Sequence, residues 1–115
     1  MRSNLREQYD DLKRRIDALT VEQKSTCVNY IKSTYGPVNE GHELASSADR
    51  ERILKELRDV SRQLWSAGNR PQALALGVIL LNIESQFTSD DDATIVKAGT
   101  DILIKETQTK DISSP

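Results

Sequence analysis

The chain has 115 residues, with 16 Lys and Arg against 18 Asp and Glu, so its formal net charge is −2 at pH 7. Hydrophobic residues make up 37% and charged residues 30%. This balance indicates one globular domain and argues against a disordered chain. The single Cys excludes an intramolecular disulfide and favours a reducing, cytoplasmic compartment. No unbroken apolar run exceeds four residues, whereas a membrane span needs about 20.

Residues 5–19 carry a narrow apolar seam at spacings of four, three, four and three, formed by Leu5, Tyr9, Leu12, Ile16 and Leu19. Almost everything between these positions is polar or charged. So narrow a seam predicts a helix that packs against one partner helix, as in a two-heptad coiled coil. The partner helix lies either in the same chain or in another chain.

A second helix is predicted after Thr20, which forms a capping box with Gln23. Its end is predicted at Gly36, because glycine accepts the left-handed closing conformation and Pro37 does not continue a helix. Residues 37–47 show no apolar period and predict a loop.

A third helix is predicted from a cap at Ser46 or Ser47 to Ala67, with Gly68 after its end. It has two apolar ridges, and such a helix usually contacts two neighbours. The main ridge contains Ile53, Leu57, Val60 and Leu64, and the second contains Leu54, Ser61 and Trp65.

Two further helices follow. Asn69 and Pro71 begin the fourth, which is apolar almost all round over residues 73–83 and is therefore expected to be buried. Ser89 and the acidic residues 90–92 begin the fifth, where carboxylates favour the positive end of the helix dipole. The residues expected on its buried side are Ile95, Val96, Gly99, Ile102 and Leu103, with Ile104 pointing away.

No segment alternates with period two, so the chain is predicted to be an all-α, five-helix bundle. An N-terminal helical hairpin precedes a three-helix unit whose central helix is buried, and helices three to five are expected to stack as antiparallel neighbours. Residues 1–107 form the expected single domain, and residues 108–115 form a flexible tail.

The segment 64–74 resembles the turn of one tetratricopeptide-repeat hairpin, with Gly68 and Ala73 at the small-residue positions. The resemblance covers one hairpin, because no 34-residue recurrence is present. It implies two closely packed helices here.

The residues with reactive side chains do not form a catalytic or metal motif. Cys27 flanks an apolar face, where a free thiol usually packs as a small hydrophobe. Glu40, His42 and Glu43 lie in the predicted loop and provide at most a small enzymatic site or a weak metal site. Residues 90–92 are explained by helix capping without an ion. We therefore expect no catalysis, no cofactor and no metal.

Nucleic-acid binding is the alternative class. The basic residues that would carry it are Lys13, Arg14, Arg15, Lys55, Arg58 and Arg62. Acidic residues interrupt both basic clusters, so neither has the strong basic field that phosphate binding needs.

The leading hypothesis is a small cytoplasmic protein–protein interaction module: a regulator, antiactivator, secretion chaperone, immunity protein or adaptor. Trp65 lies near Arg58 and Arg62, a composition typical of interface anchors, and these three residues are the predicted partner-binding set. The alternative interpretation is that Trp65 packs as an ordinary core residue. A homodimer is also expected, because a short chain gains burial by association. Its predicted self-association residues are Leu5, Tyr9, Leu12 and Ile16.

Overall fold

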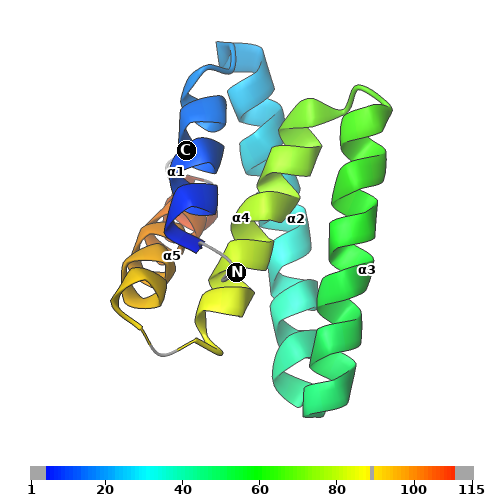
Figure 1. The fold of residues 1–115 in the computed structure, drawn as a ribbon. Helices are drawn as coiled ribbons and strands as arrows, with labels where there is room; N and C mark the ends of the chain where they lie inside the picture. Colours follow the sequence, from blue (N-terminus) through cyan, green and yellow to red (C-terminus); the bar gives the residue numbers. More distant parts are fainter. Residues whose placement is uncertain (1–4, 89, 111–115) are drawn as a thin grey trace.

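Five helices form the protein in a computed structural model that describes residues 5–88 and 90–110 (Figure 1). The helices are α1 (Leu5–Asp17), α2 (Val21–Leu44), α3 (Ser47–Ser66), α4 (Arg70–Ser85) and α5 (Asp91–Lys110). No strand occurs within these described ranges. The prediction of an all-α, five-helix fold is therefore confirmed.

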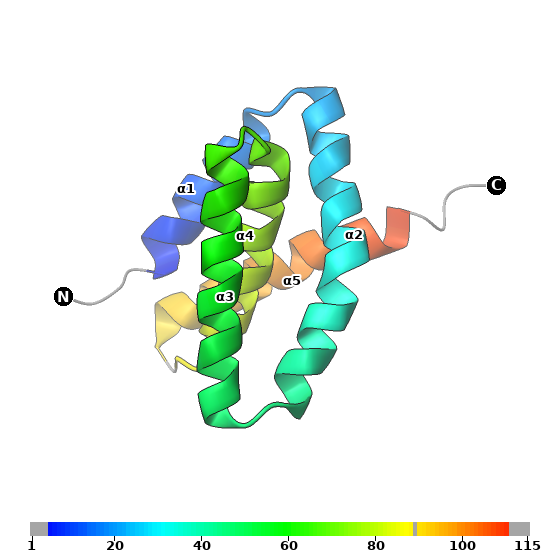
Figure 2. The same ribbon diagram turned by 90° about the vertical axis from the view of Figure 1, so that its right-hand side faces the viewer.

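Helix α4 is the centre of the fold, as its apolar sequence predicts. Every residue from 73 to 83 except Gly77 is buried, and all four other helices pack on α4. In Figure 1, α3 lies on one side of α4, and α1 and α5 lie on the other. Figure 2 shows α5 crossing α4 at a steep angle, so the expected antiparallel stacking applies to α3 and α4 but not to α5.

The apolar seam of α1 packs inside its own chain, against α4 and α5. Leu5 and Leu12 are buried, and Tyr9 and Ile16 are partly buried against the same core cluster. The apolar surface of Leu5 and Leu12 is thus covered by intrachain contacts, whereas Tyr9 and Ile16 stay partly accessible. The self-association of these four residues stays a prediction.

Two glycines allow α1 to approach closely. A Cβ added at Gly77 of α4 would lie 3.1 Å from Cδ1 of Leu12. At Gly99 of α5, an added Cβ would overlap the Tyr9 hydroxyl and lie 2.6 Å from Cζ of its ring. Each glycine therefore leaves space for one residue of the α1 seam, which explains why α1 lies over both helices.

The loop predicted for residues 37–47 is wrong, because α2 continues through Pro37 to Leu44. Proline removes one intrahelical hydrogen bond and disfavours a helical residue before it, and the missing Cβ of Gly36 relieves that second effect. Tyr35 and Val38, on either side of the proline, pack against the core cluster that contains Leu54 of α3. This burial offsets the cost of the proline. In Figure 2 the half of α2 after the proline turns toward α3.

The predicted helix ends are largely confirmed. Thr20 and Gln23 form the reciprocal capping box, and the Ser46 hydroxyl accepts a hydrogen bond from the backbone N–H of Asp49. Gly68 closes α3 with a φ of 88°, in the left-handed region that glycine favours. Asn69 is at the N-cap position of α4 without a side-chain capping bond.

The buried face of α5 differs from the prediction. Ile95 and Ile102 are 43% and 58% exposed, whereas Ile104 is buried. Thr100 and Thr107 take their place in the core, because their hydroxyls donate to the backbone carbonyls of Val96 and Ile104. The prediction counted only apolar side chains and therefore missed both threonines.

The start and end of α5 also bear on the predictions. Asp90 caps the helix by accepting a hydrogen bond from the backbone N–H of Ala93, as expected for the acidic run. The predicted cap residue Ser89 lies outside the described residues. The helix continues through Lys110, past the predicted domain end at 107, and residues 111–115 of the predicted tail lie outside the described residues.

A polar cluster joins α4 to α5 within the core. The Asn82 side chain, fully buried, donates hydrogen bonds to Oγ1 of Thr100 at 2.9 Å and to Oδ1 of Asp101 at 2.7 Å. Its oxygen accepts a hydrogen bond from Gln86, and Lys97 donates to the other oxygen of Asp101. These bonds satisfy the buried amide and define how α5 lies on α4.

Candidate functional site

The best candidate for a functional site is a groove of about 580 Å³ between α1, α3 and α4, which we call the Trp65 groove. Helix α1 provides one wall, α3 provides the other, and α4 lies at the floor with Gly77 among the lining residues. The wall residues with the most distinctive chemistry are Asp11, Arg15, Arg58, Arg62 and Trp65. The groove thus contains all three residues of the predicted partner-binding set.

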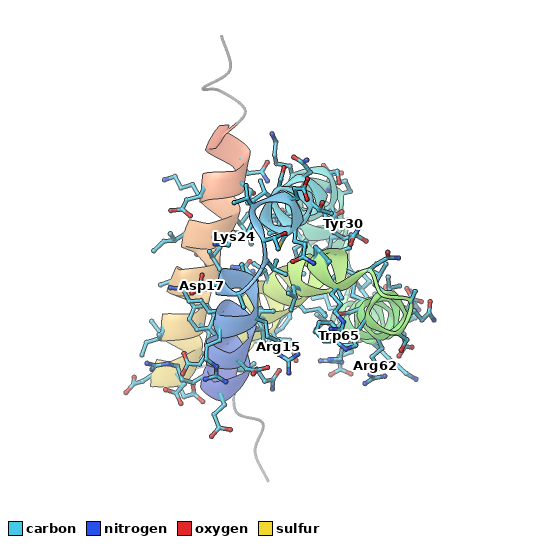
Figure 3. The ribbon with its side chains drawn as sticks, turned by 90° about the horizontal axis from the view of Figure 1, so that it is seen from above. Arg15, Asp17, Lys24, Tyr30, Arg62 and Trp65 are labelled. Atoms are coloured by element: carbon cyan, nitrogen blue, oxygen red, sulfur yellow. The ribbon has the colours of Figure 1, made fainter. Side chains whose placement is uncertain are left out.

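Trp65 is at the centre of this arrangement. Its indole is partly buried against the core cluster and partly accessible to solvent. The side chain therefore has both a core contact and a surface that a partner can reach. The guanidinium carbons of Arg15 and Arg70 lie 5.2 Å and 4.8 Å from its ring centroid, within the range of cation–π contacts. Figure 3 shows Arg15 and Trp65 meeting between α1 and α3. The stacking of Arg15 on Trp65 links the α1 wall of the groove to its α3 wall.

The other two arginines of the predicted set form ion pairs. Nη2 of Arg58 lies 2.6 Å from Oε2 of Glu84, and this pair joins α3 to α4. Arg62 pairs with Asp59 on its own helix at 3.1 Å, and its side chain is 75% exposed. Exposed pairs contribute little to stability, so Arg62 can exchange Asp59 for another anion at small cost.

The groove has a slight excess of positive charge. Its lining contains three arginines, Arg15, Arg58 and Arg62, against two carboxylates, Asp11 and Glu84. Hydrogen bonds from Arg15, and also from Arg14, lower the pKa of Asp11 despite the opposing effect of desolvation. The carboxylate therefore stays charged and holds Arg15 in place. A locally positive groove on a chain of net charge −2 favours an anionic ligand.

A second groove, of about 1340 Å³, lies at the other end of α3, and we call it the Phe87 groove. It is lined by α3 residues from Ser47 to Arg58, by Phe87 after α4, and by the acidic residues Asp90, Asp91 and Asp92. Arg50 stacks over the half-exposed Phe87 ring at 5.7 Å. Arg58 and Glu84 line both grooves, so their ion pair marks the place where the two meet.

The reactive residues do not come together in either groove. Cys27 is buried in the core, and burial raises the pKa of its thiol to about 11, so it stays protonated at neutral pH. Glu40 and Glu43 lie on α2, not on a loop, and the side chain of His42 lies outside the described residues. Within the described part of the chain, no three His, Cys, Asp or Glu residues are arranged to hold a metal ion.

The basic residues of the nucleic-acid alternative are mostly engaged with acidic neighbours. Arg14 and Arg15 both pair with Asp11, and the pairs of Arg58 and Arg62 are described above. Lys13 and Lys55 are exposed on α1 and α3, and of the two only Lys55 lines a groove. The six residues therefore do not form one continuous basic surface.

Three groups at the site are not evident from sequence periodicity. Arg70 reaches Trp65 across the turn between α3 and α4, and Arg15 reaches it from α1. Glu84 holds Arg58 from the C-terminal part of α4. Hydrophobic spacing identifies helix faces but does not show which helices become neighbours, so no signal in the sequence predicts these contacts.

Comparisons with protein-family models, with curated proteins and with solved structures found no match to this chain. None of the helices in the described ranges is long and apolar enough to cross a membrane.

Proposed function

We propose that the protein is a non-catalytic protein–protein interaction module that binds its partner in the Trp65 groove. The observation that supports this most directly is the convergence of Trp65 with Arg15, Arg58 and Arg62 at one groove, with Arg70 stacked on the same indole. Tryptophan and arginine are the residue types most enriched at energetically dominant interface positions. The module would act as a regulator, chaperone, immunity protein or adaptor, by occupying a surface of its partner.

Protein is a better partner for this groove than nucleic acid. Phosphate binding depends on many unpaired cations, which neutralise phosphates and release the counterions condensed on the nucleic acid. Here Arg15, Arg58 and Arg62 each have a carboxylate partner, and the excess over the lining carboxylates is one charge. A protein surface with one or two acidic residues beside apolar ones matches this better.

Homodimerisation is a separate proposal, since the α1 seam is used within the chain. Ile95 and Ile102, seven residues apart on α5, are the exposed pair that would serve it. Ala98 lies between them and is also exposed.

Copurification from the organism that makes the protein tests the proposed function. A tagged wild-type chain is expected to retain a protein that Trp65→Ala loses. Val21→Ala, a truncation at an 85% exposed position at the start of α2 and outside both grooves, is expected to keep it. Circular dichroism should show the same helix content for all three proteins. Equal recovery of the same proteins with wild type and Trp65→Ala would contradict the proposal.

A further inference from the structure

We propose that the partner enters this site as an amphipathic α-helix of about 20 residues, which lies along α3 with its carboxylates at the Trp65 end. This inference rests on the proposed function and specifies the class of partner segment. It is supported by the shape of the combined grooves, the helices that bound them and the charge difference between their ends.

The two grooves lie end to end along α3 and adjoin at the Arg58–Glu84 ion pair. Arg58 and Glu84 line both grooves, so no other element separates the Trp65 groove from the Phe87 groove. The lining residues of α3 extend from Ser47 to Ser66, the whole of that helix. At about 1.5 Å per residue, this stretch is about 30 Å long. A ligand that fills it needs five or more helical turns.

The surrounding elements favour a helical ligand. Helices α1 and α3 each pack on α4, which lies between them, and Arg15 of α1 stacks on Trp65 of α3 at one end (Figure 1). The ligand site is therefore bounded by two helices with a third at its floor, as in helix-in-groove recognition. Strand addition has no template, because the described residues contain no strand edge.

The two ends of the site differ in charge. The Trp65 groove is lined by three arginines and two carboxylates, and Arg70 adds a further cation at the indole. The Phe87 groove is lined by four cations, Arg50, Arg52, Lys55 and Arg58, and by five carboxylates, Glu51, Glu84, Asp90, Asp91 and Asp92. The first is thus positive by one charge and the second negative by one. A partner helix gains most when its Asp and Glu residues face the Trp65 end, because the exposed Arg62 can exchange Asp59 for a carboxylate of the partner.

A peptide selection tests this proposal with defined probes. A phage-displayed library of random 20-residue peptides is selected on the wild-type protein and counter-selected on Trp65→Ala. Enriched peptides without tryptophan are then synthesised and titrated, with Trp65, the only tryptophan of the chain, as the fluorescent reporter. We expect apolar residues at i, i+3, i+4 and i+7, acidic residues toward one end, and helix formation on binding by circular dichroism.

Matched variants and peptides measure the contributions separately. Arg62→Glu is expected to weaken binding at least tenfold, and Lys105→Glu, the same charge change at an exposed position on α5, less than twofold. Ten-residue halves of each peptide are expected to bind at least tenfold more weakly. Replacing the acidic residues of the peptide by lysine should have a comparable effect.

The outcomes separate this inference from the proposed function. Trp65-dependent peptides that are extended, lack acidic residues or bind equally to both charge variants would overturn the helical, acidic partner and leave the groove as a protein-binding site. Failure to select any Trp65-dependent peptide would overturn the inference, whereas the copurification experiment decides the proposed function. Tight binding of a 20-nucleotide single strand that Arg62→Glu abolishes would overturn both.

Discussion

Replacement of Gly99 by alanine should destabilise the fold by disturbing the packing of α1. A Cβ at this position would lie 2.6 Å from Cζ of Tyr9, whereas ordinary carbon contacts begin at about 3.4 Å, so the ring must withdraw by almost 1 Å. Overpacking of this kind costs about 1–3 kcal/mol. Against it, alanine is favoured over glycine in a helix interior by up to about 1 kcal/mol.

Gly41→Ala is the matched control, because that glycine lies in α2 with no atom within 4 Å of an added Cβ. Gly36 is less suitable, since it precedes Pro37. In urea unfolding, the free energy of unfolding of Gly99→Ala should fall below that of Gly41→Ala by about 1–3 kcal/mol. With an m-value of about 2 kcal/mol per M, this separates the midpoints by roughly 1 M. In a Tyr9→Ala background the difference should disappear. Equal stability of the two glycine variants in the wild-type background would refute the packing of Tyr9 on α5.

Three further predictions concern α4 and α5. Asn82→Ala should lower the free energy of unfolding by about 2–4 kcal/mol, because it removes hydrogen bonds to Thr100 and to the charged Asp101, and a loss below 1 kcal/mol in urea titrations would contradict this. Burial acts to raise the pKa of Asp101, but hydrogen bonds from Lys97 and Asn82 outweigh it and lower the pKa. The Asp101 carboxylate therefore stabilises the folded state above its unfolded pKa of about 4, and this stabilisation is lost as pH falls through the folded pKa. The free energy of unfolding of Asn82→Ala should consequently depend less on pH in that range than that of wild type. Sedimentation equilibrium should show a wild-type dimer that Ile102→Glu converts to a monomer, and a monomeric wild type at high micromolar concentration would remove the homodimer proposal.

The positions of the helices follow from local patterns, and their packing does not. The apolar seam of α1 and the nearly uniform apolarity of α4 predict both helices and the central burial of α4. The partner of α1 depends on the spaces at Gly77 and Gly99, which belong to two helices far along the chain. A single glycine in the sequence does not indicate which residue packs on it. The apolar period of α1 is therefore compatible with pairing within the chain and with pairing between chains.

Two predictions from the sequence, the end of α2 and the buried face of α5, are wrong because tertiary contacts override local patterns. The rule that proline ends a helix fails at Pro37, where neighbouring side chains of α2 are partly buried against α3 and α4. The buried face of α5 was misplaced because Thr100 satisfies its hydroxyl within the helix and then packs as an apolar residue would. At the candidate site, the association of Trp65 with Arg58 and Arg62 is visible in the helical spacing. The approach of Arg15 and Arg70 depends on the helix arrangement.

Site-specific photocrosslinking in the producing cells tests the assignment of the Trp65 groove most directly. A benzophenone amino acid is placed at Ser66, which lines the groove and is exposed, or at Lys105, which is exposed on α5. We predict a protein adduct of defined mass from position 66 that is absent from position 105 and is lost when Trp65→Ala is added. Adducts of the same protein from both positions, or none from position 66, would contradict a partner bound in this groove.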